Sequence, residues 1–555
     1  MADAITLQIV RNRVASLMQE MHYHFYRSGY STIIRESKDF SCAILDETGR
    51  LLVAPPMFFH APVYRHFCGY ILDHYGKEGI ADGDVFVCNH PYEGGLPHVS
   101  DMGFVAPIFA DGALVGFSGA VAHKADVGGT NPGSTSPNAT ELYHEGLLLP
   151  PVRIVRKGQY NADLERVILA NSRQPRLVKG DMLGQIACVE MGVKRTKDMC
   201  EKLGSGEVRE AFQALLKGAA AELDAAIRAL PDGQSSAEGF MDSDGVDNDT
   251  PVRFACTVTV KGGRMTIDLS NCAPQTRGPI NLRPSMVEAC VFYSLIGALD
   301  PQIYYNDGMR DVVDIVVAPN TVTNASPPAP VSNYQSANLK LVDVILEALA
   351  HFRPERAIAN AGASGALLIQ WKGGGRPGQA SMQYEILGSA YGGGKGYDGC
   401  TAVATHLSNL HNTPIEIIES EFPCRITDFD IVADSAGAGE NRGGLAFRRT
   451  YELLQDAVVV RRADRAKCPP KGLAGGRDGE PSRFVIGVGT SEERAVSPMG
   501  RYEMKAGDKF TLQSPGGGGY GDPKCRAADA IRQDIAEGYV SREAARAIHD
   551  YNDES

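Results

Sequence analysis

The chain has 555 residues, of which 43% are hydrophobic and 22% are charged. These proportions are typical of a folded globular protein and exclude a disordered chain, a coiled coil and a collagen-like repeat. The 55 Lys and Arg residues against 67 Asp and Glu residues give a net charge of −12. An acidic chain is a poor candidate for binding the phosphate backbone of a nucleic acid. At about 150 residues per domain, the length predicts three to four domains.

The N-terminal residues MADAITLQIVRNRV show no basic segment followed by an apolar one, the pattern of a secretory signal. No stretch approaches the roughly 18 apolar residues of a transmembrane helix. The 12 cysteines form no C-x-x-C pair, which excludes the spacing of zinc fingers and iron–sulfur sites. We therefore expect a cytoplasmic protein without membrane contact, whose cysteines are mostly buried and reduced.

The first 158 residues predict an α/β domain. Apolar residues recur at helical spacing over 5–27, and 65–78 is expected to form a second helix. The segment 40–54 predicts two strands joined by a DETG turn, and 102–123 predicts a hairpin that turns at A-D-G. Between them, 84–95 predicts a strand that runs into a Gly-rich turn.

The residues that follow predict three further parts. Apolar spacings of three and four over 159–233 indicate a helical segment, with its strongest helix at 207–230. The sequence then becomes rich in β-branched residues and glycine, with a strand, a Gly-Gly turn and a strand at 252–269 and helices at 281–300 and 338–352.

At the C-terminus, 526–551 predicts two short helices, the first ended by Gly538 and the second capped by Ser541. The expected fold is α+β and multidomain, with four parts. These are an N-terminal α/β metal-binding domain (1–158), a helical segment (159–233), a larger β-rich part (234–523) and a C-terminal helical hairpin (524–555).

One region is dense in residues that ligate metals. His98 and Asp101 stand three residues apart after a Gly-Gly turn. The surrounding segments add His123 and Asp126, Asp39, and the group Glu141, His144 and Glu145. Two imidazoles with carboxylates suit a borderline divalent ion such as zinc, manganese or iron. Ligands on loops and strand ends would leave an open coordination position, which a catalytic metal needs.

The spacing of these residues along the sequence does not determine which of them would bind the metal. His60, His66 and His90 lie nearby in the sequence, and an H-x-x-D pair also fits a hydrogen-bonded loop histidine. Cys42, close to Asp39, is more typical of a buried structural cysteine than of a nucleophile.

Two glycine-rich segments carry less chemistry. SAYGGGKGYDG (389–399) misses the phosphate-loop pattern because its lysine is followed by glycine instead of Ser or Thr. We expect it, and SPGGGGYGDP (514–523), to form turns where backbone approaches backbone closely.

Taken together, several segments resemble the hydantoinase B/oxoprolinase family, and the resemblance runs from about residue 5 to 550. The segments are RESKDFSCAILDETGRLL (35–52), NHPYEGGLPHVSDMGFVAPIF (89–109), AHKADVGG (122–129), ELYHEGLLLPPVRI (141–154), GPINLRPSMVEACVFYSL (278–295), HNTPIEIIESEFPCRI (411–426), ADSAGAGENRGGLAFRR (433–449) and SPGGGGYGDP (514–523). No single segment is specific for this family, but the set of segments is.

The resemblance implies a subunit that works with a larger hydantoinase A-type chain of actin-like ATPase fold. That partner, and not this chain, would bind ATP, in a hetero-oligomer that we expect to be (αβ)2. Relatives open hydantoins, 5-oxoproline and caprolactam, or belong to acetone and acetophenone carboxylases. The family's divalent metal would be held here by Asp39, His98, Asp101 and His123, with zinc expected first and manganese or iron as alternatives.

The sequence departs from the family pattern at one position. Many members read A-H-H-x-D-x-G-G, whereas Lys124 stands in place of the second histidine. A lysine adds a cation that could hold an anionic substrate group or a phosphorylated intermediate. It could equally point away from the site, because neighbouring residues of a strand face opposite sides.

The leading hypothesis is the catalytic B-type subunit of an ATP-dependent hydrolase that acts on the carbon–nitrogen bond of a small cyclic amide. The partner would phosphorylate the amide oxygen, and the metal would activate water. Asp126 or His144 would serve as general base or orient the ligands, and Lys124 would contact the substrate. One alternative is a subunit of a ketone carboxylase that uses the same metal as an electrophile. Another is a non-catalytic scaffold whose metal only joins loops.

Overall fold

The structure is a computed structural model that describes residues 4–374 and 381–551. Residues 552–555 of the expected C-terminal hairpin region lie outside the described part. Two compact units are present. Unit 1 comprises Met1–Ser235, Cys256–Tyr334 and Leu407–Asn409, and unit 2 comprises Ser236–Ala255, Gln335–His406 and Leu410–Ser555. Each unit is therefore assembled from separate stretches of the chain, and the division of the sequence into four consecutive parts stays a prediction.

Unit 1 is built on a six-stranded antiparallel sheet in the order β1-β4-β3-β2-β5-β6. Its strands are β1 (Phe40–Asp46), β2 (Val85–Cys88), β3 (Asp101–Ala110), β4 (Ala113–His123), β5 (Val152–Arg156) and β6 (Gln159–Tyr160). The expected β3–β4 hairpin is confirmed. Its turn places Asp111 and Gly112 at φ of 51° and 76°, the left-handed conformation that tight hairpin turns require.

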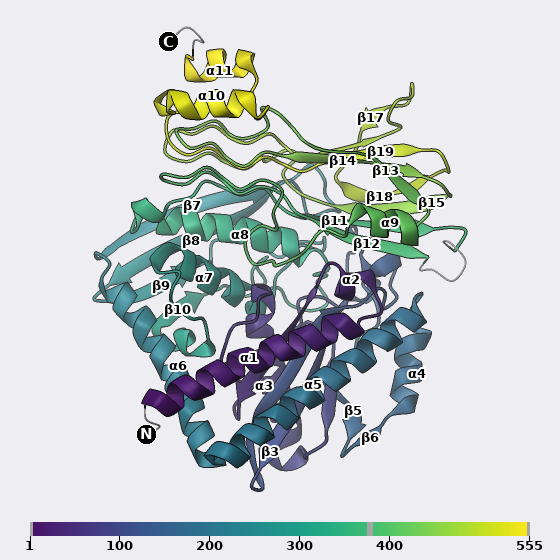
Figure 1. Ribbon diagram of the computed structural model, residues 1–555, viewed down its shortest axis with the longest axis vertical. Helices are drawn as coiled ribbons and strands as arrows, with labels where there is room; N and C mark the ends of the chain where they lie inside the picture. Colours follow the sequence, from purple (N-terminus) through teal and green to yellow (C-terminus); the bar gives the residue numbers. More distant parts are fainter. Residues whose placement is uncertain (1–3, 375–380, 552–555) are drawn as a thin grey trace. The chain divides into compact units, whose positions relative to one another are not determined.

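Helices cover both faces of this sheet. A Cβ added to Gly119 would lie 2.7 Å from the ring of Tyr64 on α3 (Ala61–Gly79). The neighbouring Ser118 instead meets Gly192 of α5 (Pro175–Leu203), on the opposite face. Figure 1 shows α1 (Ala4–Ser28) lying beside α5 on that second face.

The helical stretch 159–233 shares its core with the sheet. It forms α4 (Ala162–Ala170), α5 and α6 (Ser205–Arg228). The predicted apolar stripe of α6 is buried, and Val208, Phe212 and Leu216 belong to the same hydrophobic cluster as Met102 and Phe104 of β3. The helices therefore bury their apolar faces against the strands of unit 1.

The prediction of a second strand within 40–54 is wrong. After β1 and its turn, only a single bridge joins Leu45 to Leu51. The backbone N–H of Leu51 donates to Oδ2 of Asp307 at 2.7 Å. The N–H of Asp46 donates to the carbonyl of Arg50 at 2.9 Å, and that of Leu52 donates to Ile44 at 3.3 Å. The Leu51 N–H therefore faces away from β1, and the chain leaves the sheet after this one bridge.

The rest of unit 1 follows the expected pattern. The strand, Gly-Gly turn and strand are β8 (Val252–Lys261), in which the chain returns from unit 2 to unit 1, and β9 (Arg264–Asp268). β10 (Val313–Val316) pairs parallel to β9. The expected helix at 281–300 is α7 (Pro284–Leu299). Two further elements are the short α2 (Thr32–Arg35) and β7 (Gly233–Met241), in which the chain passes from unit 1 into unit 2.

The described residues of unit 2 form two sheets of their own, ordered β12-β11-β15-β18 and β13-β14-β19-β16-β17. The strands are β11 (Gly365–Trp371), β12 (Met382–Leu387), β13 (Cys424–Ile431), β14 (Phe447–Leu453), β15 (Ala457–Arg462), β16 (Arg483–Ile486), β17 (Arg494–Ala495), β18 (Met499–Met504) and β19 (Lys509–Gln513). One apolar cluster joins both sheets and includes Trp371, Tyr451 and Phe510.

The glycine-rich segments of unit 2 lie backbone against backbone, as expected. Gly393 N–H donates to the carbonyl of Gly518 at 2.8 Å, and Gly517 N–H donates to that of Gly444 at 2.9 Å. A Cβ on Gly517 would lie 2.5 Å from the carbonyl carbon of Tyr391. Only glycine leaves room for such approach, so these residues are explained by packing.

In the described part of unit 2, the α-helices are α8 (Tyr334–Leu349), α9 (Ile415–Glu421), α10 (Ala528–Ala536) and α11 (Arg542–His549). The C-terminal pair confirms the predicted hairpin. Gly538 adopts φ of 72°, and Ser541 Oγ caps α11 by accepting the N–H of Ala544 at 3.1 Å. Within residues 4–374 and 381–551, no helix has the length and apolar character needed to cross a membrane.

Candidate metal centre

Adjacent strand ends bring three predicted ligands together. Asp101 begins β3, His123 ends β4, and the two residues pair directly across the hairpin. Asp39 precedes β1, and its carbonyl accepts the N–H of His123 at 3.1 Å. Because side chains alternate along a strand, Asp101 and His123 share the sheet face that Gly119 presents to α3.

His98 reaches the same point from the loop between β2 and β3. Asn89 anchors this loop, donating to the carbonyls of Val99 and Leu147 at 2.8 Å each. Nδ1 of His98 lies 3.2 Å from the carbonyl of Ser332. A carbonyl can only accept, so Nδ1 carries the proton and Nε2 is left with its lone pair.

The cluster has the dimensions of a metal site. Oδ1 of Asp101 lies 3.2 Å from Nε2 of His98 and 3.2 Å from Nδ1 of His123. A tetrahedral ion with bonds of about 2.0–2.1 Å separates its ligand atoms by about 3.3 Å. His98, Asp101 and His123 are all buried and form a group able to hold a metal. Nε2 of His98 makes no hydrogen bond within the described residues, so the residues present fit a divalent ion.

The charge balance around Asp101 favours its ionised form. Burial opposes ionisation, but the imidazoles of His98, His123 and His60 outweigh it and hold the pKa of the Asp101 carboxyl well below its usual range. A carboxylate that stays ionised in a buried site is ready to bind a cation.

The fourth predicted ligand lies at the edge of the cluster. Oδ2 of Asp39 is 4.0 Å from Nδ1 of His123, and the Asp39 side chain is buried. Its role as a ligand stays a prediction.

Lys124 faces away from this cluster. It follows His123 directly, so it points to the α5 face of the sheet. Its ammonium group donates to the side-chain carbonyl of Gln185 on α5, and the Gln185 amide donates to the carbonyls of Met102 and Ala120. Burial lowers the pKa of Lys124 to about 8, against the opposing effect of Asp181. A catalytic role for Lys124 stays a prediction, but these contacts tie the helix to the sheet.

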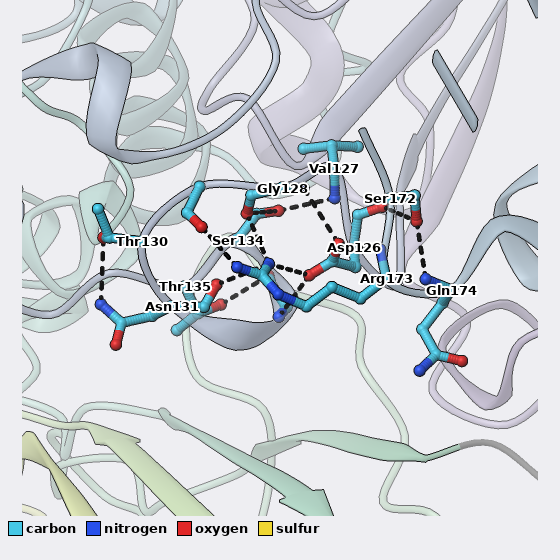
Figure 2. Close-up of polar contacts among 12 residues, drawn as sticks. Asp126, Val127, Gly128, Thr130, Asn131, Ser134, Thr135, Ser172, Arg173 and Gln174 are labelled. Atoms are coloured by element: carbon cyan, nitrogen blue, oxygen red, sulfur yellow. Dashed lines mark hydrogen bonds and ion pairs between the residues drawn. The ribbon is translucent and has the colours of Figure 1, made fainter. Parts of the chain in front are cut away.

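Asp126 organises the loop after β4 (Figure 2). Oδ1 accepts the backbone N–H groups of Gly128 and Arg173 at 3.1 and 2.7 Å, and Oδ2 accepts that of Gly133 at 2.9 Å and Nη1 of Arg173 at 2.8 Å. The Arg173 guanidinium also donates to the carbonyls of Gly128, Gly129 and Asn131. Every oxygen of the fully buried Asp126 is thus engaged in holding this loop.

His144 lies on a short helical turn (Leu142–His144) and is partly exposed. Its Nε2 is 3.3 Å from Oε1 of Glu141, and its Nδ1 accepts the N–H of Thr140 at 3.3 Å. These contacts connect it to its own loop. A role for His144 as general base stays a prediction.

Two residues that the sequence brings near the candidate ligands without assigning them a role lie next to the cluster. Glu145 is fully buried and accepts the N–H groups of Val331 and Ser332 at 2.5 and 2.7 Å, so it fixes the carbonyl that orients His98. His60, also fully buried, places Nε2 3.6 Å from Oδ2 of Asp101. Spacing along the chain could not reveal either contact, because the partners lie 41 to 187 positions away.

Fold and site together define a mixed α/β chain with a buried His–Asp–His cluster at the end of an antiparallel sheet. Residues 3–523 match the model of the family described as hydantoinase B/oxoprolinase, and the chain belongs to this family. It is 32% identical to the B subunit of a putative D-/L-hydantoinase from a Pseudomonas strain, over 98% of this chain and 94% of the relative. It is 28% identical to the beta subunit of the caprolactamase of Pseudomonas jessenii, over 98% and 95%.

Two solved structures share the fold. The ATP-dependent caprolactamase of Pseudomonas jessenii superimposes with a TM-score of 0.92 at 26% identity, over 100% of this chain and 97% of that one. A nucleotide-free acetone carboxylase reaches a TM-score of 0.89 at 18% identity, over 99% and 79%. The second likeness concerns the fold alone.

Proposed function

We propose that this chain is the metal-bearing B-type subunit of an ATP-dependent hydrolase that opens a small cyclic amide. The observation that carries the proposal is the buried His98–Asp101–His123 cluster, in a family whose relatives here include the B subunit of a hydantoinase and the beta subunit of a caprolactamase. Asp39 would complete the ligand set. ATP would be bound by an A-type partner, in an (αβ)2 assembly.

The residues of the chain would prepare the site before any substrate arrives. Asp101 would supply a permanent negative charge, and the Ser332 carbonyl would keep the ligating nitrogen of His98 unprotonated. Asp126 and Arg173 would hold the loop after His123. When bound, a divalent ion would act as a Lewis acid and lower the pKa of water towards about 7.

An unstrained cyclic amide resists opening because its resonance must be broken. Phosphorylation of the amide oxygen at the partner's ATP site would remove this resonance and make the carbonyl carbon electrophilic. Addition of water to that carbon would let the ring carbon–nitrogen bond break with protonation of the amine, and the acyl phosphate that remains would be hydrolysed to carboxylate and phosphate. This chain would then supply the second half of the reaction, in a buried site that excludes bulk water.

The experiment is elemental analysis of the purified chain beside His98→Ala and His123→Ala, with His351→Ala as a control at an exposed histidine. Circular dichroism would check folding. We expect near-stoichiometric zinc, manganese or iron in the wild type and the control, and its loss from both folded variants. A folded wild type that is active with its A-type partner but holds no metal would refute the proposal.

Reconstitution with the A-type partner then separates the alternatives. Lactams and ketones would be offered with ATP, with and without bicarbonate. ATP-dependent ring opening supports the hydrolase, whereas carboxylation of a ketone would identify a carboxylase subunit. Metal-depleted chains that unfold and lose activity in step would indicate a scaffold with a structural ion.

A further inference from the structure

We propose that His60 is a positioning residue of the metal centre: it donates its Nε2 proton to Oδ2 of Asp101, so that this carboxylate offers only Oδ1 to the cation. The inference rests on the metal centre proposed above. It adds a residue outside the four expected ligands and a reason for the coordination position that hydrolysis needs.

A chain of hydrogen bonds reaches His60 from the sheet. The backbone N–H of Val121 donates to the hydroxyl oxygen of Tyr64 at 3.1 Å. That oxygen lies 2.7 Å from Oγ of Ser41, and Oγ lies 2.9 Å from Nδ1 of His60. The three side chains are fully buried, so water does not offer competing partners.

The direction of this chain is fixed by its first donor. Because Tyr64 accepts from a backbone N–H, its own proton must go to the other group within reach, Ser41. Ser41 then has its proton left for Nδ1 of His60, which must accept it. Burial raises the pKa of Tyr64 well above its ordinary value, so its hydroxyl keeps the proton that sets this direction.

An imidazole that accepts at Nδ1 carries its proton at Nε2 when neutral. Nε2 of His60 points at Oδ2 of Asp101 across 3.6 Å, which is longer than a formed hydrogen bond. Both atoms are buried, and neither has a hydrogen-bond partner within the described residues. A buried donor and a buried acceptor without partners each destabilise the fold, so there is a driving force to close this gap.

The consequence concerns the number of ligand atoms. Oδ1 of Asp101 faces the two ligand imidazoles at 3.2 Å, while Oδ2 faces His60. An Nε2–H donor engaged with Oδ2 keeps that oxygen from joining Oδ1 on the ion. Asp101 then fills one coordination position instead of two, so an ion that already holds one atom from each of the four ligands keeps its fifth position for water or substrate.

The experiment replaces the native ion with Co²⁺ in the full chain and records its visible absorption and its affinity in competition with a chelator. His60→Leu removes the donor, and His60→Gln keeps an amide N–H in the place of Nε2. Ser41→Ala breaks the relay while leaving both the ligands and His60 intact. His351→Leu, at an exposed site, is the control.

We expect tetrahedral-type absorption in the wild type, His60→Gln and the control. In His60→Leu the absorption should weaken, because Oδ2 joins the coordination, and Co²⁺ affinity should change by about 10–100-fold. Ser41→Ala should show a smaller change of the same kind, and it keeps the test valid if His60→Leu fails to fold.

Two results would overturn the proposal. One is an identical spectrum and affinity in His60→Leu, Ser41→Ala and the wild type. The other is loss of the ion from His60→Gln and His60→Leu alike, which would make His60 a ligand itself. A wild-type chain that takes up no Co²⁺ and no native ion would instead refute the proposed function.

Discussion

Replacing Asp126 with Asn tests whether this residue anchors the loop or acts on substrate. Four donors converge on its carboxylate: the backbone N–H groups of Gly128, Gly133 and Arg173, and the Arg173 guanidinium. An Asn side chain has nearly the same size but only one acceptor oxygen. Its NH₂ group would face two of these donors in place of an acceptor.

The magnitude follows from the bonds that are lost. A hydrogen bond to a charged group contributes about 1.5–3 kcal/mol, and a buried donor left without a partner is destabilising by a similar amount. The Arg173 side chain is 34% exposed, so water weakens the ion-pair part of the effect. We expect Asp126→Asn to lower the free energy of unfolding by about 2–4 kcal/mol.

The assay is chemical denaturation of Asp126→Asn and the wild type, with metal content and turnover measured on the same samples. Asp111→Asn, at an exposed turn, is the control and should stay within about 0.5 kcal/mol of the wild type. If Asp126 anchors the loop, the stability, metal affinity and turnover rate of Asp126→Asn should fall together. Unchanged stability and full metal content with a lost rate would refute this reasoning and support Asp126 as the general base.

Four further outcomes are expected. Gly517→Ala should lower the free energy of unfolding of unit 2 by about 1–3 kcal/mol, because the added Cβ would clash with the backbone carbonyl of Tyr391. Gly218→Ala, in the open face of α6, should stabilise the chain by about 0.5–1 kcal/mol. Thermal unfolding checks both predictions, because the melting temperature should fall in Gly517→Ala and rise in Gly218→Ala. Burial and the Asp242 charge raise the pKa of Asp464 to about 8 from 3.8, so its ionised form is disfavoured in the fold. The resulting destabilisation is absent below pH 3.8 and grows up to about pH 8. Stability of Asp464→Asn relative to wild type should therefore rise between pH 5 and pH 8 in denaturation curves, and a constant difference would contradict this. Lys124→Met should keep its metal, because the amine lies on the opposite sheet face; metal loss in a folded variant would contradict that placement.

Local signals in the sequence specified much of the fold. The apolar spacing of α1 and α6, the Asp-Gly turn of the β3–β4 hairpin and the Ser541 cap are interactions between near neighbours. Local patterns are sufficient there because the partners lie within a few residues of one another. The segment after β1 was not predicted correctly: it forms a single bridge to β1, and the N–H of Leu51 donates to a carboxylate 256 positions away that no local pattern relates to it.

The sequence by itself determined the family and the dense group of His and Asp residues between 98 and 126. It left open which of these residues face one another. Tertiary structure decided that Lys124 points away from His123, because the strand pleat alternates sides. It also decided that Asp126 is saturated by loop donors and that His60, Ser41 and Tyr64 form a relay toward Asp101. Such choices depend on strand register and helix packing, which juxtapose residues that no spacing along the chain relates.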